Sequence, residues 1–82
     1  MTTTLPTINS NGTPEEQLYA DNAVAYSAVR KALKIVSSHG PNGRDYPNDA
    51  DLQRAVAEHE ERCDKLNAVL KDYAAIAKHL DS

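Results

Sequence analysis

The sequence predicts an all-α fold, an antiparallel helical hairpin preceded by an extended N-terminal arm. Two long segments have apolar residues at helical spacing, a segment rich in Gly and Pro separates them, and each helical segment has start or stop signals. The chain has 82 residues, enough for one domain. A domain of this size buries only about 60–65% of the surface of its unfolded chain, so a marginal core is expected.

The first segment, residues 1–12, is rich in Thr, Asn and Ser and contains Pro6 and Gly12. These residue types disfavour regular structure, so we expect an extended arm. Two apolar residues, Leu5 and Ile8, could pack against the hairpin that residues 13–82 are expected to form.

The first helix is expected over about residues 14–38. Thr13 is followed by Pro14 and, three residues on, by Glu16, which together form a capping box with Pro at the first helical position. Gly40 lies just past the expected last turn, where glycine often ends a helix.

The loop is expected over residues 39–48, where Gly and Pro exclude regular structure. The second helix is expected over about 49–80, with Asn48 or Asp49 as its N-cap residue. No Gly or Pro interrupts the chain from there to the end of that helix.

Both helices have a stripe of residues spaced alternately three and four apart, as in a coiled coil. We call these two stripes the predicted seam: Tyr19, Asn22, Tyr26, Val29, Leu33 and Val36 on the first helix, and Leu52, Val56, His59, Cys63, Leu66, Leu70, Tyr73, Ala77 and Leu80 on the second. When the two helices fold antiparallel about the loop, Val36 faces Leu52 and Asn22 faces Leu66. Asn22 is interpreted as a device that fixes the register of the seam.

In this register the second helix extends beyond the first from Tyr73 onward. Leu5 and Ile8 of the arm are the favoured cover for that overhang, and a second copy of the chain is the alternative.

A second apolar line flanks the predicted seam, and one hairpin would leave it unused. Its candidate interface residues are Val24, Ile35, Val69 and Ile76. Apolar residues beyond those that one hairpin can bury favour self-association, most simply as a dimeric four-helix bundle. The alternative is that these side chains lie half exposed, as single apolar residues often do.

The loop end is the candidate ligand site, because glycines allow close approach and basic side chains gather there. Its candidate residues are Lys34, His39, Arg44 and Tyr46. An anionic nucleotide is the ligand that fits these side chains. The alternative is a structural loop in which Arg44 pairs with Asp45 or Asp49.

Charge and composition exclude several classes of function. A net charge of −3 and a pI near 5.5 argue against a general nucleic-acid binder. There is no apolar run of 18 residues and no signal-peptide pattern at the start, so no membrane association and a cytoplasmic location are expected. His59 and Cys63 have metal-ligand spacing, but two ligands do not make a zinc site. We therefore expect no metal, no cofactor and no enzymatic activity.

The segment from His39 to Tyr46, followed by the heptad run through Glu58, His59 and Arg62 to Leu80, resembles small helical-hairpin proteins of tailed phages and prophages. The resemblance covers about residues 18–80. It implies an inhibitor of a host or defence protein, or an oligomer that sequesters a signalling nucleotide.

Together these patterns predict a non-enzymatic protein-interaction module. A nucleotide binder at the loop end is the first alternative, and a structural or assembly component of a larger particle is the second.

Overall fold

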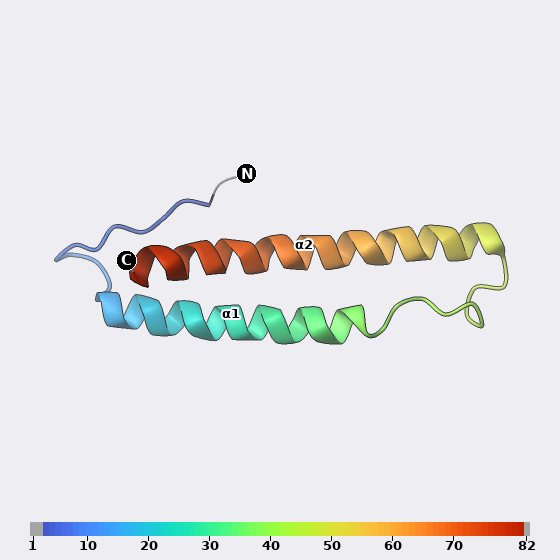
Figure 1. The fold of residues 1–82 in the computed structure, drawn as a ribbon, viewed down its shortest axis with the longest axis horizontal. Helices are drawn as coiled ribbons and strands as arrows, with labels where there is room; N and C mark the ends of the chain where they lie inside the picture. Colours follow the sequence, from blue (N-terminus) through green and yellow to red (C-terminus); the bar gives the residue numbers. More distant parts are fainter. Residues whose placement is uncertain (1–2, 82) are drawn as a thin grey trace.

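The computed structural model describes residues 3–81 and shows two antiparallel helices in that range, α1 (Glu15–Ser37) and α2 (Asp49–Asp81), with no strands (Figure 1). The molecule is elongated, with extents of 59 × 22 × 19 Å. The predicted all-α helical hairpin is therefore confirmed. No helix within the described range is both long enough and apolar enough to cross a lipid bilayer.

The start of α1 differs from the predicted capping box. Pro14 is the N-cap residue, and no side chain caps this end of the helix. The Leu18 amide donates to the Pro14 carbonyl oxygen at 3.0 Å and closes the first turn. Glu15 and Glu16 lie in that turn, where their negative charge is favourable beside the free amides.

The end of α1 is closed by side chains. The Ser38 hydroxyl donates to the Ile35 carbonyl oxygen at 2.7 Å, and the Ser37 hydroxyl donates to the carbonyl of the preceding turn at 3.0 Å. His39 Nδ1 lies 2.7 Å from the same Ile35 oxygen. No described glycine has a positive φ, so Gly40 does not form the left-handed cap that its position suggested.

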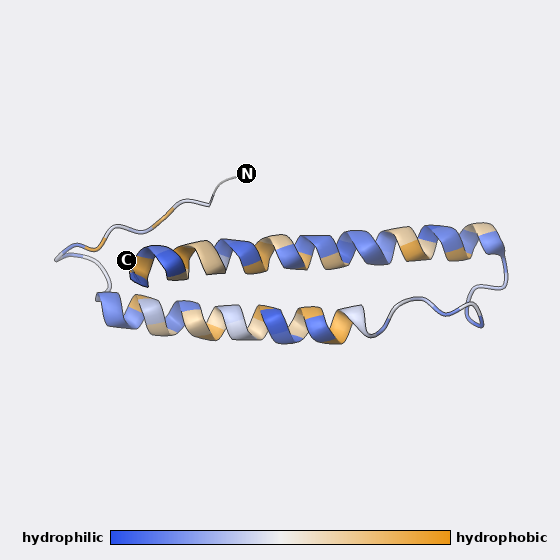
Figure 2. Cartoon of the chain, viewed as in Figure 1, coloured by the Kyte–Doolittle hydropathy of each residue, from blue (hydrophilic) through white to orange (hydrophobic). Residues whose placement is uncertain are grey.

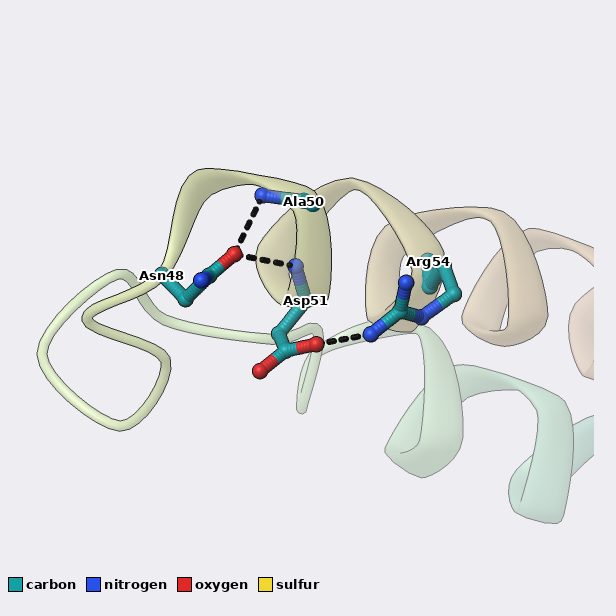
Figure 3. A network of polar contacts seen from close by, with 4 residues as sticks. All are labelled: Asn48, Ala50, Asp51 and Arg54. Atoms are coloured by element: carbon teal, nitrogen blue, oxygen red, sulfur yellow. Dashed lines mark hydrogen bonds and ion pairs between the residues drawn. The ribbon is translucent and has the colours of Figure 1, made fainter.

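Asn48 caps the start of α2. It is one of the two residues, Asn48 and Asp49, that were predicted as the N-cap. Its Oδ1 atom accepts hydrogen bonds from the amides of Ala50, at 2.9 Å, and Asp51, at 3.2 Å (Figure 3). Asp51 also pairs with Arg54 one turn on. An Asn cap stabilises a helix by about 1 kcal/mol. Because Asn48 occupies these two amides, they are not available to an anion.

The register of the hairpin differs from the predicted one by one heptad. Asn22 Nδ2 donates to the Tyr73 carbonyl oxygen at 3.1 Å, seven positions beyond Leu66, the residue that it was expected to face. The first turn of α1 and the last turn of α2 thus lie at the same end (Figure 1).

The loop explains this shift. It does not turn tightly but runs extended along the first turns of α2 (Figure 1). A Cβ at Gly40 would lie 3.4 Å from His59 Nε2, and one at Gly43 would lie 3.8 Å from a methyl carbon of Leu52. The overhang of α2 is therefore at its start, where the loop packs against it.

The contact between the helices is thin. Asn22, Ala55 and Leu80 are the most buried described residues, and none of the described side chains is completely buried. Apolar residues are scattered along both helices among polar ones (Figure 2). A two-helix hairpin has only one interior stripe, so a core of this kind contributes little stability.

The buried stripe is also rotated at its ends relative to the predicted seam. Leu18 is half-buried while Tyr19 is 44% exposed, and Ala55 is buried while its neighbour Val56 is 38% exposed. Tyr19 and Val56 were therefore wrongly predicted as interior. A straight helix drifts by about 20° per heptad from an exact 3.5-residue repeat, so a strict heptad line leaves the interface toward its ends.

The arm lies beside the last turns of α2 (Figure 1). His79 Nε2 donates to the Pro6 carbonyl oxygen at 2.9 Å. Leu5 and Ile8, the predicted covering residues, remain largely exposed. The arm thus lies along the end of α2, as predicted, but it makes this contact through Pro6. In the observed register α1 also lies along this end of α2.

Candidate functional site

The loop end contains a polar cavity of about 280 Å³ between the loop and the first half of α2. Its ionisable lining residues are His39, Asp45, Tyr46, Glu58, His59 and Arg62. The cavity exists because the loop runs back along α2 and places its own side chains opposite those of the helix.

Two of the four predicted ligand residues line this cavity and two do not. His39 and Tyr46 belong to its wall. Arg44 lies on the exposed part of the loop, where its backbone amide donates to Asn42 Oδ1 at 2.9 Å and its Nε to the same atom at 3.4 Å. Lys34 is exposed in the last turn of α1, outside the wall. The candidate site is thus only partly the predicted one.

Three residues of α2 were missed by the sequence reasoning. Glu58 and His59 are adjacent, Arg62 follows one turn later, and all three face the loop. Their spacing could have been noticed, but the predicted register placed the loop elsewhere. His59 Nε2 also lies 3.7 Å from Cys63 Sγ.

The charges of this cavity are mixed. Arg62 and the His59 imidazole can donate to an anionic or polar ligand, whereas Asp45 and Glu58 oppose a strongly negative one. Among the described residues, no group of three His, Cys, Asp or Glu side chains is placed to hold a metal ion. The geometry suits a small polar ligand with both donor and acceptor groups.

A second hollow lies on one face of the hairpin, at the end where the start of α1 lies beside the end of α2. This tyrosine groove has a volume of about 360 Å³ and is lined by Tyr19, Asn22, Ala23, Tyr26, Ser27, Ala74 and Ala77. Both helices contribute to it, and none of its lining side chains is charged.

A third hollow, the arm groove, lies on the opposite side of the seam and has a volume of about 270 Å³. Leu18, Ala25, Tyr73 and Ile76 line it together with Pro6 of the arm. The arm therefore contributes one residue, Pro6, to this face of the hairpin.

The predicted interface residues are exposed on α1 and partly buried on α2. Val24 is 70% exposed and Ile35 is 49% exposed. They are eleven residues apart, close to three full turns, so they project from the same outer side of α1. Val69 is 40% exposed, whereas Ile76, one heptad later, is half-buried in the arm groove.

Comparison of the chain with family models, with curated proteins and with solved structures finds no match. The resemblance to small phage proteins therefore stays a prediction, and the function must be argued from the faces of the hairpin.

Proposed function

We propose that the chain is a non-enzymatic protein-interaction module that presents the outer side of α1 to a partner protein. The observation that carries the proposal is the exposure of large apolar side chains on a hairpin whose own interior is thin. Val24 and Ile35 project together from α1, away from the contact with α2.

Energetics support this proposal. Burying a Val or Ile side chain fully contributes about 1.5–3 kcal/mol relative to leaving it exposed. A small domain without disulfides or metals has only a few kcal/mol of net stability. A partner that covers Val24 and Ile35 would therefore add a stabilisation comparable to that of the hairpin itself.

The partner that fits is a protein with a complementary apolar helix or groove, because an amphipathic helix is recognised through side chains on one of its faces. The resemblance to phage proteins makes a host or defence protein the proposed target, with inhibition as the outcome. Assembly into a larger particle would use the same outer side.

The test is a double variant, Val24→Glu with Ile35→Glu. Both side chains are exposed, so the helical circular dichroism should be retained, while affinity for the partner should fall at least about tenfold, which is about 1.4 kcal/mol. Proteins cross-linked to the chain in its native cells are identified by mass spectrometry and then bound to each variant.

The matched control is Gln53→Glu with Ala75→Glu, which places two glutamates at exposed positions on α2. This control should bind as the unmodified chain does. Equal binding by the Val24/Ile35 variant and by the control would contradict the proposal.

The loop cavity supports a second candidate function, the binding of a small polar ligand with donor and acceptor groups, such as a nucleotide. His39, Tyr46, His59 and Arg62 converge on one cavity there. A ligand at 100 times its dissociation constant adds about 2.7 kcal/mol. In a domain of this size that raises the melting temperature by roughly 10 °C or more.

The measurement is thermal melting with a panel of nucleotides. Arg62→Ala should remove the shift caused by the active nucleotide, and Arg44→Ala should retain it because Arg44 lies outside the cavity wall. A panel without any shift contradicts this second function and leaves the interaction proposal intact.

A further inference from the structure

The exposed surface of this chain is larger than a compact monomer of its mass would have. Its accessible surface is 6461 Å², and its mass is 9.0 kDa. The scaling for folded monomers gives about 4,850 Å² at this mass, so the excess is about 1,600 Å². A standard interface removes about 800 Å² from each partner, and obligate dimers remove more. A dimer interface would therefore use a large part of the excess.

The tyrosine groove is the face best suited to such an interface. The arm groove on the other side already contains a residue of the arm, Pro6, whose carbonyl oxygen accepts a hydrogen bond from His79. The tyrosine groove combines side chains from both helices without any charge, and Tyr19 is 44% exposed at its rim. Depletion of charge and enrichment of Tyr are typical of the centre of an interface.

This groove combines large and small side chains, as a patch that pairs with a copy of itself requires. A two-fold interface brings the same patch of both chains together, so that patch must contain projections and the hollows that receive them. Tyr19, which is 44% exposed, and the half-buried Tyr26 one heptad later are the large side chains of this patch, and Ala23, Ala74 and Ala77 line the hollow. Ser27 adds a hydroxyl to the same wall, where a tyrosine hydroxyl needs a polar neighbour.

We propose that a second copy of this chain occupies the tyrosine groove, so that two hairpins form a two-fold symmetric four-helix bundle with Tyr19 and Tyr26 of each chain packed into the alanine-lined hollow of the other. This proposal goes beyond the protein-interaction function because it assigns a different face and a defined partner. It also places the dimer interface away from Val24 and Ile35, which remain outside the bundle.

The experiment compares two neighbouring substitutions in the full chain, Ala23→Glu and Val24→Glu. Both positions are exposed, and adjacent helical residues point about 100° apart. Sedimentation equilibrium of the unmodified chain should give twice the mass of 9.0 kDa. Ala23→Glu should raise the dissociation constant of the dimer at least about a hundredfold, because the symmetric interface contains the new charge twice. Val24→Glu should leave the dissociation constant unchanged.

A second variant, Ala74→Glu, tests the α2 side of the groove and should dissociate the dimer as Ala23→Glu does. Helical circular dichroism of each variant separates dissociation from unfolding. A monomeric unmodified chain at its highest soluble concentration overturns the proposal. So does a dimer that Val24→Glu dissociates, or one that both groove variants leave intact. Partner binding is tested with the Val24/Ile35 variant and dimerisation with the groove variants. The failure of one proposal is therefore distinguishable from the failure of the other.

Discussion

Replacing Leu80 with alanine is expected to lower the free energy of unfolding by about 2–5 kcal/mol, the range for large-to-small changes at buried sites. Leu80 is 6% exposed, although it is only two residues from the end of the chain. It lines the arm groove and also a hollow beside Glu15 and Tyr19 at the start of α1. One side chain thus joins the arm, the first turn of α1 and the last turn of α2.

Thermal melting followed by circular dichroism measures this effect at one fixed protein concentration, since association would change the apparent stability. For a domain of 60–100 residues, each kcal/mol shifts the melting temperature by about 4–8 °C. Val24→Ala is the control, because Val24 is 70% exposed, and its effect should stay within about 0.5 kcal/mol. Equal losses in the two variants would show that Leu80 does not hold this end together.

Replacing Asn22 with leucine is expected to allow the two helices to pair in more than one register. In the observed register its amide donates to the Tyr73 carbonyl at 3.1 Å while the residue is only 8% exposed. In the register shifted by one heptad it would face Leu66 instead. A buried amide without a partner costs about 1–3 kcal/mol, so Asn22 disfavours that alternative. Leucine fits both registers, and we expect a mixture of the two.

Spin labels measure the register directly. Labels at Ala20 and Ala75, both exposed, in a Cys63→Ser background should give one distance in the unmodified chain. In the Asn22→Leu variant a second distance should appear, since seven helical residues correspond to a shift of about 10 Å. Dilution with unlabelled chain removes distances between copies.

The control for the register experiment is Val29→Ile, an apolar change in the seam that leaves Asn22 in place. It should retain the single distance. One unchanged distance in the Asn22→Leu variant would show that the loop alone fixes the register.

The two helices could be predicted from the sequence because local signals define them. Asn48 caps α2 as one of the two expected residues, and no helix boundary differs by more than one residue from the prediction. The register could not be predicted in the same way. A heptad repeat fits its partner equally well after a shift of seven residues, so the pattern of apolar residues cannot choose between the two alignments. The loop, which packs along α2, and the hydrogen bond from Asn22 to Tyr73 favour the observed alignment.

In the candidate site, too, the residues within one segment could be predicted, and those that depend on the register could not. His39 and Tyr46 were predicted because they belong to the loop itself. Glu58, His59 and Arg62 were missed because they enter the cavity only in the observed register. Arg44 was predicted from its charge, yet Asn42 binds its side chain and backbone on the exposed loop. Residues from distant parts of a chain can be assigned to one site only when the register is known.

The loop lying along the start of α2 implies uneven local stability. The second half of α2 is held by α1 and by the arm, whereas its first turns are covered by a segment without regular structure (Figure 1). Local unfolding begins where packing is sparse and backbone hydrogen bonds are exposed to solvent. The loop and the first turns of α2 are therefore expected to unfold locally as one unit. The amide hydrogens of that unit exchange with solvent before the amide hydrogens around Asn22 and Leu80. The loop cavity belongs to that unit, so any molecule bound there would slow its opening without contacting the rest of the hairpin.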